Sequence, residues 1–317
     1  MISLGHGSGG RLTWDLINEM HRDLTDIQLT DSALLEVGQR IAFTTDSFVV
    51  NPIFFPGGDI GKLSVCGTVN DLAVMGAEPL FLSSALIIEE GFEREKLRKI
   101  IASMEETSKS SGVKIVTGDT KVVEKGKADG IFINTSGIGS LGDHEQGRIE
   151  AGDEIVINGP IGQHAIAIMS SRFGLDYRID SDCAPLNGLI SSLPLDSVKF
   201  MRDPTRGGVS ATLNEVVSGS DFGIELYEDT IPVSEEVRAV CELLGFDPLY
   251  LANEGKVVVI ADDGEDVVKA MRKHPLGKKA EIIGKVTPDR GRVFLRSVSG
   301  GRRIVDMPVA DQLPRIC

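Results

Sequence analysis

Three aspartates in the first half of the chain could together hold a cation. Asp46 closes the run TTD behind a short apolar segment, Asp71 lies inside an apolar helical pattern, and Asp119 stands in the motif GDTK. Carboxylates that converge on one cleft repel each other unless a positive charge lies between them, and a hard divalent cation carrying phosphate oxygens is a common solution. The set therefore predicts a metal–phosphate site. Taken singly, each aspartate is explained as well by a helix N-cap or a solvated helix face.

Two elements must position the first two of these carboxylates. The apolar run at residues 41–43 predicts a short strand that delivers Asp46 at its exit. A Pro-Gly-Gly break at residues 56–58 is followed by a predicted buried helix with apolar residues on one side. Asn70 and Asp71 point away from that side, so this pair can face Asp46. The residues that define the apolar side are Val65, Val69, Leu72 and Gly76.

Two glycine-rich stretches look like phosphate-binding motifs, but neither matches a known class of such motifs. Residues 5–10, GHGSGG, satisfy GxGxxG, but no strand precedes them, which excludes a dinucleotide-binding motif. They remain a loop of backbone amides that could wrap a phosphate, or a disordered terminus, ahead of a predicted helix at residues 14–21. Residues 58–64, GDIGKLS, are not a P-loop, because Pro56 replaces the first glycine and Leu63 the serine or threonine.

The remaining pattern mixes helices and strands in both halves of the chain. A helical stripe over residues 94–111 ends at Gly112, and strands are predicted at residues 114–117 and 131–135. Asp119 therefore leaves a strand, with Lys121 two residues further on. A turn-rich polar stretch at residues 139–152 predicts a domain boundary. The second half predicts strands at residues 154–158, 223–226, 256–261 and 280–286, and helices at residues 163–172, 209–217, 235–244 and 264–273.

Two polar segments of the second half, residues 202–208 and 306–317, suggest functions of their own. Residues 202–208, RDPTRGG, directly precede a predicted helix, and the dipole at a helix N-terminus favours anions. Arg202 and Arg206 could bind phosphate there or hold a dimer together. Residues 306–317 contain two prolines and no periodicity, which predicts an extended arm with a reach of roughly 40 Å at about 3.3–3.6 Å per residue. The arm ends on Cys317.

The composition is typical of a globular protein without a nucleic-acid surface. The 317 residues are 41% hydrophobic, and 33 Lys+Arg against 47 Asp+Glu give a net charge of −14. No basic stripe is left to neutralise a phosphate backbone, so we expect no nucleic-acid partner. No apolar run approaches the length of a membrane span, and the start, MISLGHGSGG, is not a signal peptide. We therefore expect no membrane association and a cytoplasmic location.

The four cysteines are scattered without CxxC spacing, which speaks against a disulfide framework or a zinc site. Cys66 and Cys241 lie in helical apolar patterns and are interpreted as small core residues. Cys317 differs, because it ends a proline-stiffened arm. Thiol chemistry requires exposure and some thiolate, which the end of such an arm can offer.

Together these motifs resemble the HypE family of hydrogenase expression/formation proteins. The segments that carry the resemblance are TTDSFVV, GKLSVCGTVNDLAVMGAEP, VTGDTK, INTSGIG, RDPTRGGV and ANEGK, closed by PRIC at the end of the sequence. They extend over essentially the whole chain. VNDLAVMGAEP is typical of the wider superfamily of aminoimidazole ribonucleotide synthetase, selenophosphate synthetase and thiamine-monophosphate kinase, and the closing PRIC is typical of this member.

The resemblance implies an α+β or α/β fold, namely a two-domain PurM-like (AIR synthetase-like) fold with an extended C-terminal tail. It divides the chain into a glycine-rich loop and helix (residues 1–40), a PurM-like ATP-binding and dimerisation domain (41–145), a second PurM-like domain (150–300) and a flexible tail (301–317). The sheet of the first domain would pair with its twin in a homodimer, with ATP bound near that interface.

The resemblance also implies a reaction on the chain's own tail during maturation of NiFe hydrogenases. The carbamoyltransferase HypF would place a carbamoyl group on the Cys317 thiol, and ATP-dependent dehydration would convert this S-carboxamide to S-cyanide, a thiocyanate. The cyano group would then pass to iron on the scaffold proteins HypC and HypD. An amide oxygen leaves poorly unless it is phosphorylated, and phosphoryl transfer depends mainly on positioning and charge neutralisation.

Carried over residue by residue, the resemblance assigns ATP and Mg²⁺ to one group of side chains and catalysis to another. The metal and ATP residues would be Asp46, Asp71 and Asp119, with further ATP contacts from Lys62, Asn70 and Arg206. The catalytic residues would be Cys317, Lys121 and Glu254. Lys121 and Glu254 would lie beside the tail thiol, where one holds the carbamoyl group and the other accepts its proton. A buried Lys121–Glu254 ion pair would explain both residues without chemistry.

Two other functions fit parts of the pattern. An ATP-dependent synthetase or kinase of a free small molecule would keep the fold but would not need Cys317. A non-catalytic carrier that docks its tail on a partner would not hydrolyse ATP and would tolerate loss of Asp46 or Asp119. The three aspartates count against the carrier, and the tail counts against the free-substrate enzyme.

Overall fold

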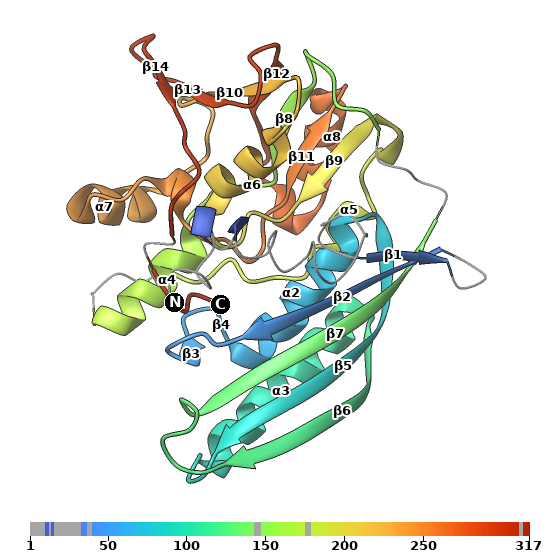
Figure 1. Cartoon of the computed structure of the whole chain (residues 1–317), viewed down its shortest axis with the longest axis vertical. Coiled ribbons are helices and arrows are strands. Elements are labelled where there is room, and N and C mark those ends of the chain that lie inside the picture. Colours follow the sequence, from blue (N-terminus) through green and yellow to red (C-terminus); the bar gives the residue numbers. More distant parts are fainter. Residues whose placement is uncertain are drawn as a thin grey trace. The chain divides into compact units, whose positions relative to one another are not determined.

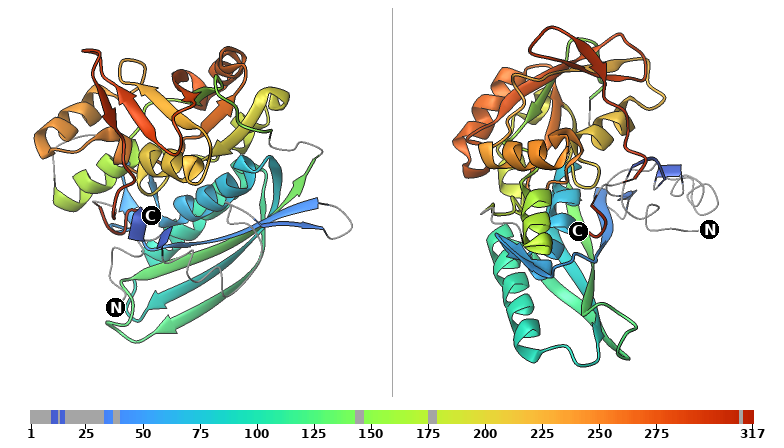
Figure 2. Two further views of the ribbon diagram at one scale, coloured as in Figure 1. Left: turned by 45° about the horizontal axis from the view of Figure 1, so that its top comes forward. Right: turned by 90° about the vertical axis from the view of Figure 1, so that its left-hand side faces the viewer.

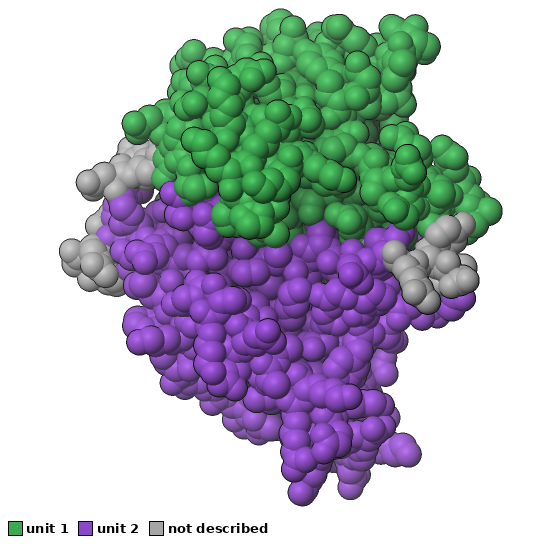
Figure 3. All heavy atoms as spheres, turned by 180° about the vertical axis from the view of Figure 1, so that it is seen from behind, with its two compact units in different colours: residues 1–26, 144–166, 192–314 green, residues 27–143, 167–191, 315–317 purple. Residues whose placement is uncertain are grey.

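The structure is a computed structural model that describes residues 10–12, 14–15, 33–36, 40–142, 147–174, 179–310 and 313–317. The chain forms two compact units, distinguished by colour in Figure 3. Unit 1 comprises residues 1–26, 144–166 and 192–314, and unit 2 comprises residues 27–143, 167–191 and 315–317. The predicted glycine-rich loop at residues 5–10 and the predicted helix at residues 14–21 fall largely outside the described residues.

Unit 2 is built on a five-stranded sheet with the order β1-β2-β7-β5-β6. Its neighbouring strands are antiparallel except for the parallel pair β5–β6. A parallel pair needs a crossover, which the helix α3 (Arg94–Ser111) supplies. The strands are β1 (Ala33–Glu36), β2 (Arg40–Phe48), β5 (Ala77–Glu89), β6 (Lys114–Val123) and β7 (Ile131–Leu141), with a small hairpin β3 (Phe54–Phe55) and β4 (Gly58–Asp59).

The helix α2 (Ile60–Val74) lies with α3 on one face of this sheet, as Figure 1 shows. The predicted helix is confirmed, but its burial is not limited to one side. Of its fifteen residues, only Lys62 and Asp71 are not buried. A helix that is apolar nearly all round is typical of a core position. The two least buried side chains are therefore the ones that α2 can offer to a ligand.

The other face of the sheet is open in the part of the chain that the structure describes. Figure 2 shows the sheet with its helices on one side only. Strand alternation places Phe43, Phe81, Ile87 and Ile138 on this open face, and each is more than one third exposed. Phe43 and Phe81 each pair with Ile138 on β7, so three of them form one row across the strands.

Three strands are longer than the sequence predicted, and this changes where two aspartates lie. The predicted strands at residues 41–43, 114–117 and 131–135 continue as β2, β6 and β7 to Phe48, Val123 and Leu141. The extensions of β2 and β6 place mainly polar residues on the open face, so the apolar pattern ends before the hydrogen-bonded strand does. The prediction that Asp46 and Asp119 leave strands at their ends is wrong, because both lie inside strands.

Unit 1 contains a seven-stranded sheet with the order β14-β13-β10-β12-β8-β11-β9. Its helix α8 packs on β8, β11 and β12, and α6 packs on β10 and β13. The strands are β8 (Glu154–Ile157), β9 (Val198–Arg202), β10 (Gly223–Tyr227), β11 (Val258–Ala261), β12 (Glu281–Thr287), β13 (Val293–Arg296) and β14 (Arg302–Ile304), and the helices are α6 (Gly208–Val217), α7 (Glu235–Leu244) and α8 (Gly264–Lys273).

The helix α4 (Gln163–Phe173) belongs partly to each unit, and the short helix α5 (Asn187–Ile190) belongs to unit 2. The core of unit 1 is almost entirely aliphatic and includes Ile155, Leu213, Val258 and Ile283. Burial of such side chains contributes about 25 cal/mol per Å² of apolar surface removed from water. Within the described ranges, every helix is too short or too polar to span a membrane.

Candidate active site

Asp46 and Asp71 lie along one seam between β2 and α2. The Thr44 hydroxyl, two residues before Asp46, donates to Asp71 Oδ2 at 2.8 Å. Asp46 Oδ2 lies close to Gly67 of α2, where an added Cβ would approach it to 3.4 Å. Gly67 and Asp71 are four residues apart, which is about one helical turn. The structure thus brings these two predicted carboxylates together.

Asn70 faces a different part of unit 2. Its side-chain oxygen accepts from the Leu186 amide at 2.8 Å, and its Nδ2 donates to the Ala184 carbonyl at 3.2 Å. The side chain is 1% exposed, so these bonds tie the segment before α5 to α2 inside the protein. Asn70 does not face β2 with Asp71 as predicted, and its contact with ATP stays a prediction.

Lys62 lies at the start of α2, where Asp59 is the N-cap. Asp59 Oδ1 accepts from the backbone amides of Gly61 and Lys62 at 2.7 and 3.0 Å, and from the Ser103 hydroxyl at 2.6 Å. The Lys62 ammonium donates to the Gly57 carbonyl at 2.8 Å. The Lys62 residue is partly buried, so this cation lies at the edge of the helix N-terminus, where anions are favoured.

Asp119 lies on the edge strand β6, apart from the other two aspartates. The cross-strand partners of Asp46 are Thr135, Ser84 and Gly118 in turn, so Asp119 is offset by one residue and points to the open face. Three strand spacings separate Asp46 from β6, which is about 14 Å. In the described residues no group of three or more metal-ligating side chains occurs. The three aspartates therefore do not meet around one ion within a single chain.

Lys121 forms an ion pair with Asp119 on the same face of β6. Its ammonium lies 2.7 and 2.6 Å from the two carboxylate oxygens, and both side chains are exposed. The Lys121 hydrogen bond, followed by that from the Thr120 amide, lowers the pKa of Asp119. Within a single chain Lys121 is exposed and paired with Asp119, so a buried Lys121–Glu254 ion pair stays a prediction.

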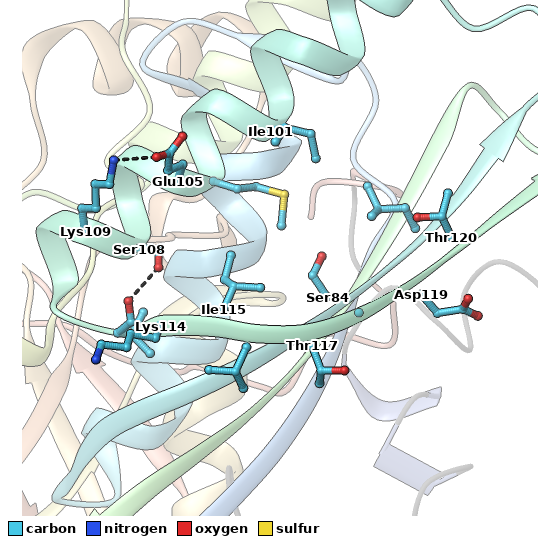
Figure 4. Close-up of a pocket in the computed structure, with 15 residues that line it drawn as sticks. Ser84, Ile101, Glu105, Ser108, Lys109, Lys114, Ile115, Thr117, Asp119 and Thr120 are labelled. Atoms are coloured by element: carbon cyan, nitrogen blue, oxygen red, sulfur yellow. Dashed lines mark hydrogen bonds and ion pairs between the residues drawn. The ribbon is translucent and has the colours of Figure 1, made fainter.

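A groove of about 840 Å³ lies between α3, β5 and the edge strand β6 (Figure 4). Apolar side chains such as Ile101 and Met104 form much of its wall, and the Asp119 residue borders it. The Ser84 hydroxyl points into the groove, is buried, and has no hydrogen-bond partner among the described residues. Sequence reasoning missed Ser84, because nothing in its local pattern distinguishes it from other strand serines.

Unit 1 holds Arg202, Arg206 and Glu254. Arg202 on β9 is paired with Glu215 at 2.7 Å, so its charge is balanced within the unit. Arg206 is exposed just before α6, as its motif predicted. Glu254 is buried in the segment before β11. The adjacent Asn253 fixes that segment, because its side chain donates to the Pro204 carbonyl and accepts from the Gly162 amide.

The helix α6 requires a glycine at its first residue. Gly208 has a φ of +63°, and an added Cβ would lie 2.6 Å from the carbonyl oxygens of Leu249 and Leu251. A side chain at this position would therefore combine backbone strain with a clash. The motif RDPTRGG is explained in part by this close packing.

Cys317 is docked on unit 2 next to the strand that carries Asp46. Its backbone oxygen accepts from the Val49 amide at 3.0 Å, and the Arg315 oxygen accepts from the Asn51 amide at 3.2 Å. Cys317 is partly exposed, whereas Cys66, Cys183 and Cys241 are buried, and none of the four forms a disulfide. Among the four cysteines, Cys317 therefore offers the most accessible sulfur.

Comparisons with known proteins agree with this arrangement. Residues 29–141 match the AIR synthase related protein, N-terminal domain, and residues 150–296 match the corresponding C-terminal domain. A putative hydrogenase expression/formation protein of Methanocaldococcus jannaschii is 47% identical over 100% of this chain and 99% of its own length. The carbamoyl dehydratase HypE of Rhodobacter capsulatus is 45% identical over 100% of this chain and 98% of its own length.

Two solved structures are similarly close. A HypE–HypF complex matches with a TM-score of 0.87 and 52% identity, over 92% of this chain and 99% of the matched chain. A HypE in complex with ATP matches with a TM-score of 0.84 and 42% identity over the full length of both chains. The predicted two-domain PurM-like fold is confirmed. This chain belongs to the HypE family of hydrogenase maturation proteins, within the AIR synthase related proteins.

Proposed function

We propose that this chain is an ATP-dependent carbamoyl dehydratase that converts a carbamoyl group on its own Cys317 to a thiocyanate during NiFe hydrogenase maturation. The observation that carries the proposal is the docking of Cys317 on Val49, three residues beyond Asp46. The tail that carries the thiol is thereby docked directly after β2, the strand that carries Asp46. Family membership supports the same activity, because relatives of high identity and full coverage are named carbamoyl dehydratases.

The chemistry balances with ATP as the only co-substrate. The γ-phosphoryl group is transferred to the carbamoyl oxygen, the nitrogen loses two protons, and the carbon–oxygen bond breaks as phosphate leaves. The carbon–nitrogen bond becomes triple, and the sulfur of Cys317 keeps the cyano group. A base must accept the nitrogen protons, and a donor must hold the carbamoyl group. We assign these roles to Glu254 and Lys121.

Mg²⁺ and ATP would bind on the carboxylates of unit 2. Asp46 and Asp71 fit a magnesium ion, because both offer hard oxygen donors on one seam and leave further positions for phosphate and water. When bound, the ion would neutralise charge on the transferred phosphoryl group. Lys62, Asn70 and Arg206 remain assigned to ATP by family resemblance.

We place the base of ATP in the groove beside Asp119. Its apolar walls suit the faces of a purine, and the buried Ser84 hydroxyl could hydrogen-bond to its edge. Substitution Ile101→Glu puts a charge at this partly exposed wall and should raise KM for ATP at least tenfold, whereas Ile101→Val should not. An unchanged KM in the Glu variant would exclude the groove.

The proposal also includes the domains, the protein partners and the cellular location of this chain. Residues 41–145 would form the ATP-binding and dimerisation domain, residues 150–300 the second domain, and residues 301–317 the tail. The open apolar sheet face supports a homodimer, and the solved HypE–HypF complex supports the carbamoyltransferase HypF as a partner. HypC and HypD would receive the cyano group. A partly exposed cysteine outside any disulfide, such as Cys317, persists in a reducing compartment, which supports the cytoplasm.

Intact mass spectrometry tests the function directly. Incubation with HypF and its carbamoyl donor should add one carbamoyl group, and Mg²⁺–ATP should then remove the mass of one water. A Cys317→Ala variant should show neither change. ATP consumption without any mass change would instead favour an enzyme of a free small molecule. Carbamoylation without ATP turnover would favour a carrier.

A further inference from the structure

The last residues of the chain are held on unit 2, beside α4 as Figure 1 shows. We call the residues that hold them the receptor; they are residues 49–51, Asp129, Phe132 and Arg172. The Val49 and Asn51 amides donate to the backbone oxygens of Cys317 and Arg315, so the tail runs antiparallel to residues 49–51. Ile316, between these two anchor points, is 2% exposed. The backbone and the Ile316 side chain are thus fixed while the thiol at the next residue stays accessible.

In the tail, Arg315 makes most of the side-chain contacts with this receptor. Its Nε donates to the Val49 carbonyl at 2.9 Å, and its Nη1 lies 2.5 Å from Asp129 Oδ2. Its guanidinium also lies over the Phe132 ring at 5.9 Å. Arg315 has a φ of +57°, a left-handed conformation that costs a non-glycine residue on the order of 1–2 kcal/mol. The three side-chain contacts offset that cost and turn the chain so that Cys317 faces Val49.

Arg172 closes the receptor from α4. Its Nε donates to the Asn51 carbonyl at 2.9 Å, and its Nη2 donates to the Arg315 carbonyl at 2.9 Å. Burial, followed by the neighbouring Arg315 charge, lowers the pKa of Arg172. Two guanidinium groups lie near each other here, and Asp129 supplies the opposite charge. We call Arg315, Arg172 and Asp129 the tail clamp.

We propose that the tail clamp positions Cys317 on its own subunit, beside the strand that carries Asp46, for the ATP-dependent step. This inference rests on the proposed function. Val49 is three residues from Asp46, which is about 10 Å along a strand. A carbamoyl group on the sulfur would have to span that distance together with the phosphoryl group that it receives. Arg315, Arg172 and Asp129 are positioning residues, because they hold the backbone that carries the sulfur.

The test uses receptor variants, since changes in the tail itself could also alter recognition by HypF. Asp129→Ala and Arg172→Met are carbamoylated by HypF, purified, and mixed with excess Mg²⁺–ATP in a single turnover. We expect dehydration to slow at least tenfold, because each change removes charge-assisted hydrogen bonds. Alkylation of unmodified Cys317 should accelerate. Arg98→Ala, which removes an exposed arginine paired with Glu95 on α3, is the control and should match the wild type.

Reversing the charges of the Arg315–Asp129 pair distinguishes loss of this contact from general damage to the fold. When only the carbamoylated fraction of each protein is assayed, so that recognition by HypF does not enter, Arg315→Glu with Asp129→Arg should recover part of the dehydration rate that either single change loses. If Asp129→Ala and Arg172→Met both dehydrate and are both alkylated at wild-type rates, the proposed role of the tail clamp is wrong. If the wild-type protein itself never loses water, the proposed function fails, whereas the alkylation rates still report on the clamp.

Mixed variants test whether the tail acts on its own subunit. A chain with Asp46→Asn and a carbamoylated Cys317 is mixed with a Cys317→Ala chain that keeps Asp46. We expect no dehydration, because the carbamoylated sulfur is docked beside the substituted residue. Dehydration in this mixture would show that the tail reaches the partner subunit and would overturn the proposal.

Discussion

At the scale of single residues, the four thiols differ in environment. A hydrogen bond with Cys66, followed by burial, raises the pKa of Cys183, and burial raises the pKa of Cys241 to about 11. At pH 8 a thiol with that pKa is about 0.1% thiolate, and only the thiolate is nucleophilic. Cys317 is the only one of the four that is not buried.

We therefore predict selective alkylation. Iodoacetamide at pH 8 should add one label to the native protein, and peptide mapping should find it on Cys317. The other three thiols should react only after unfolding, since their protection comes from burial. Cys317→Ala should remove the native label entirely. A first label on Cys183 or Cys241 would contradict the burial of these residues.

Asp71 carries a second prediction at this scale. Asp71→Asn keeps an oxygen that can accept from Thr44 but removes a charge. Dehydration should fall at least about a hundredfold, because charge stabilisation at the phosphoryl group is lost. The Mg²⁺ concentration for half-maximal rate should rise, while the unfolding midpoint stays within about 2 °C.

The matched control for Asp71 is Asp289→Asn in unit 1, which removes an exposed aspartate paired with Arg302. It should leave both the dehydration rate and its Mg²⁺ dependence unchanged. A fall in rate that extra Mg²⁺ does not alter, together with a lower unfolding midpoint, would instead give Asp71 a purely structural role.

At the scale of elements, α2 connects fold and site. Its N-cap Asp59 accepts three hydrogen bonds, two from the helix backbone and one from Ser103 on α3. The cap therefore fixes both the start of α2 and the packing of α3 against it. Asp71 and Gly67 keep their places against β2 only if this helix starts where it does.

We predict that Asp59→Ala lowers the free energy of unfolding by about 2 kcal/mol, the upper range for loss of an N-cap. Urea unfolding followed by circular dichroism measures the change. Asp59→Asn keeps an acceptor and should lose less than half as much. Equal losses in both variants would mean that the negative charge, not the cap hydrogen bonds, stabilises α2.

The helices show how far local sequence determines structure. α3, α7 and α8 begin and end where the pattern predicted, because glycines or capping side chains mark their ends, as at Gly112 and Gly245. Strand ends were harder to predict, since β2 and β6 continue through polar residues that face outward. The two-domain fold followed from family resemblance.

Long-range contacts were not predictable from local pattern. Arg315 and Asp129 are 186 residues apart in sequence, and Asn70 bonds to backbone groups more than 110 residues away. No spacing rule links such pairs. The sequence motifs identified the aspartates, but only the structure separates Asp46 and Asp71 from Asp119.

At the scale of the whole molecule, the distance between Asp119 and Asp46 favours a site that a second copy of the chain completes. Asp119 is about 14 Å from Asp46 across the sheet, too far to share one phosphate group within a chain. Phe43, Ile138 and Phe81 form an exposed apolar row on the face that Asp119 also shares. Pairing two such faces would remove apolar surface from water and bring Asp119 of one subunit toward the other subunit.

We predict that Ile138→Lys, at the centre of the row, produces a monomer in sedimentation velocity and abolishes dehydration. A lysine there would be buried without a partner in the dimer. Ile304→Lys, at an apolar residue of similar exposure in unit 1, should leave both properties unchanged. A fully active monomeric Ile138→Lys variant would show that one chain contains the complete site.

Complementation then tests whether Asp119 acts across the dimer. Asp46→Asn and Asp119→Asn should each be inactive alone. In a fully exchanged equal mixture, half of the dimers contain one of each chain, and each such dimer has one site with both aspartates intact, which gives about a quarter of wild-type activity. The competent site keeps Asp46 and Cys317 on the same chain, so this outcome is compatible with a tail that works on its own subunit. If the mixture stays inactive while the dimers exchange, both aspartates must come from one chain, and Asp119 would have to approach Asp46 through a change within unit 2.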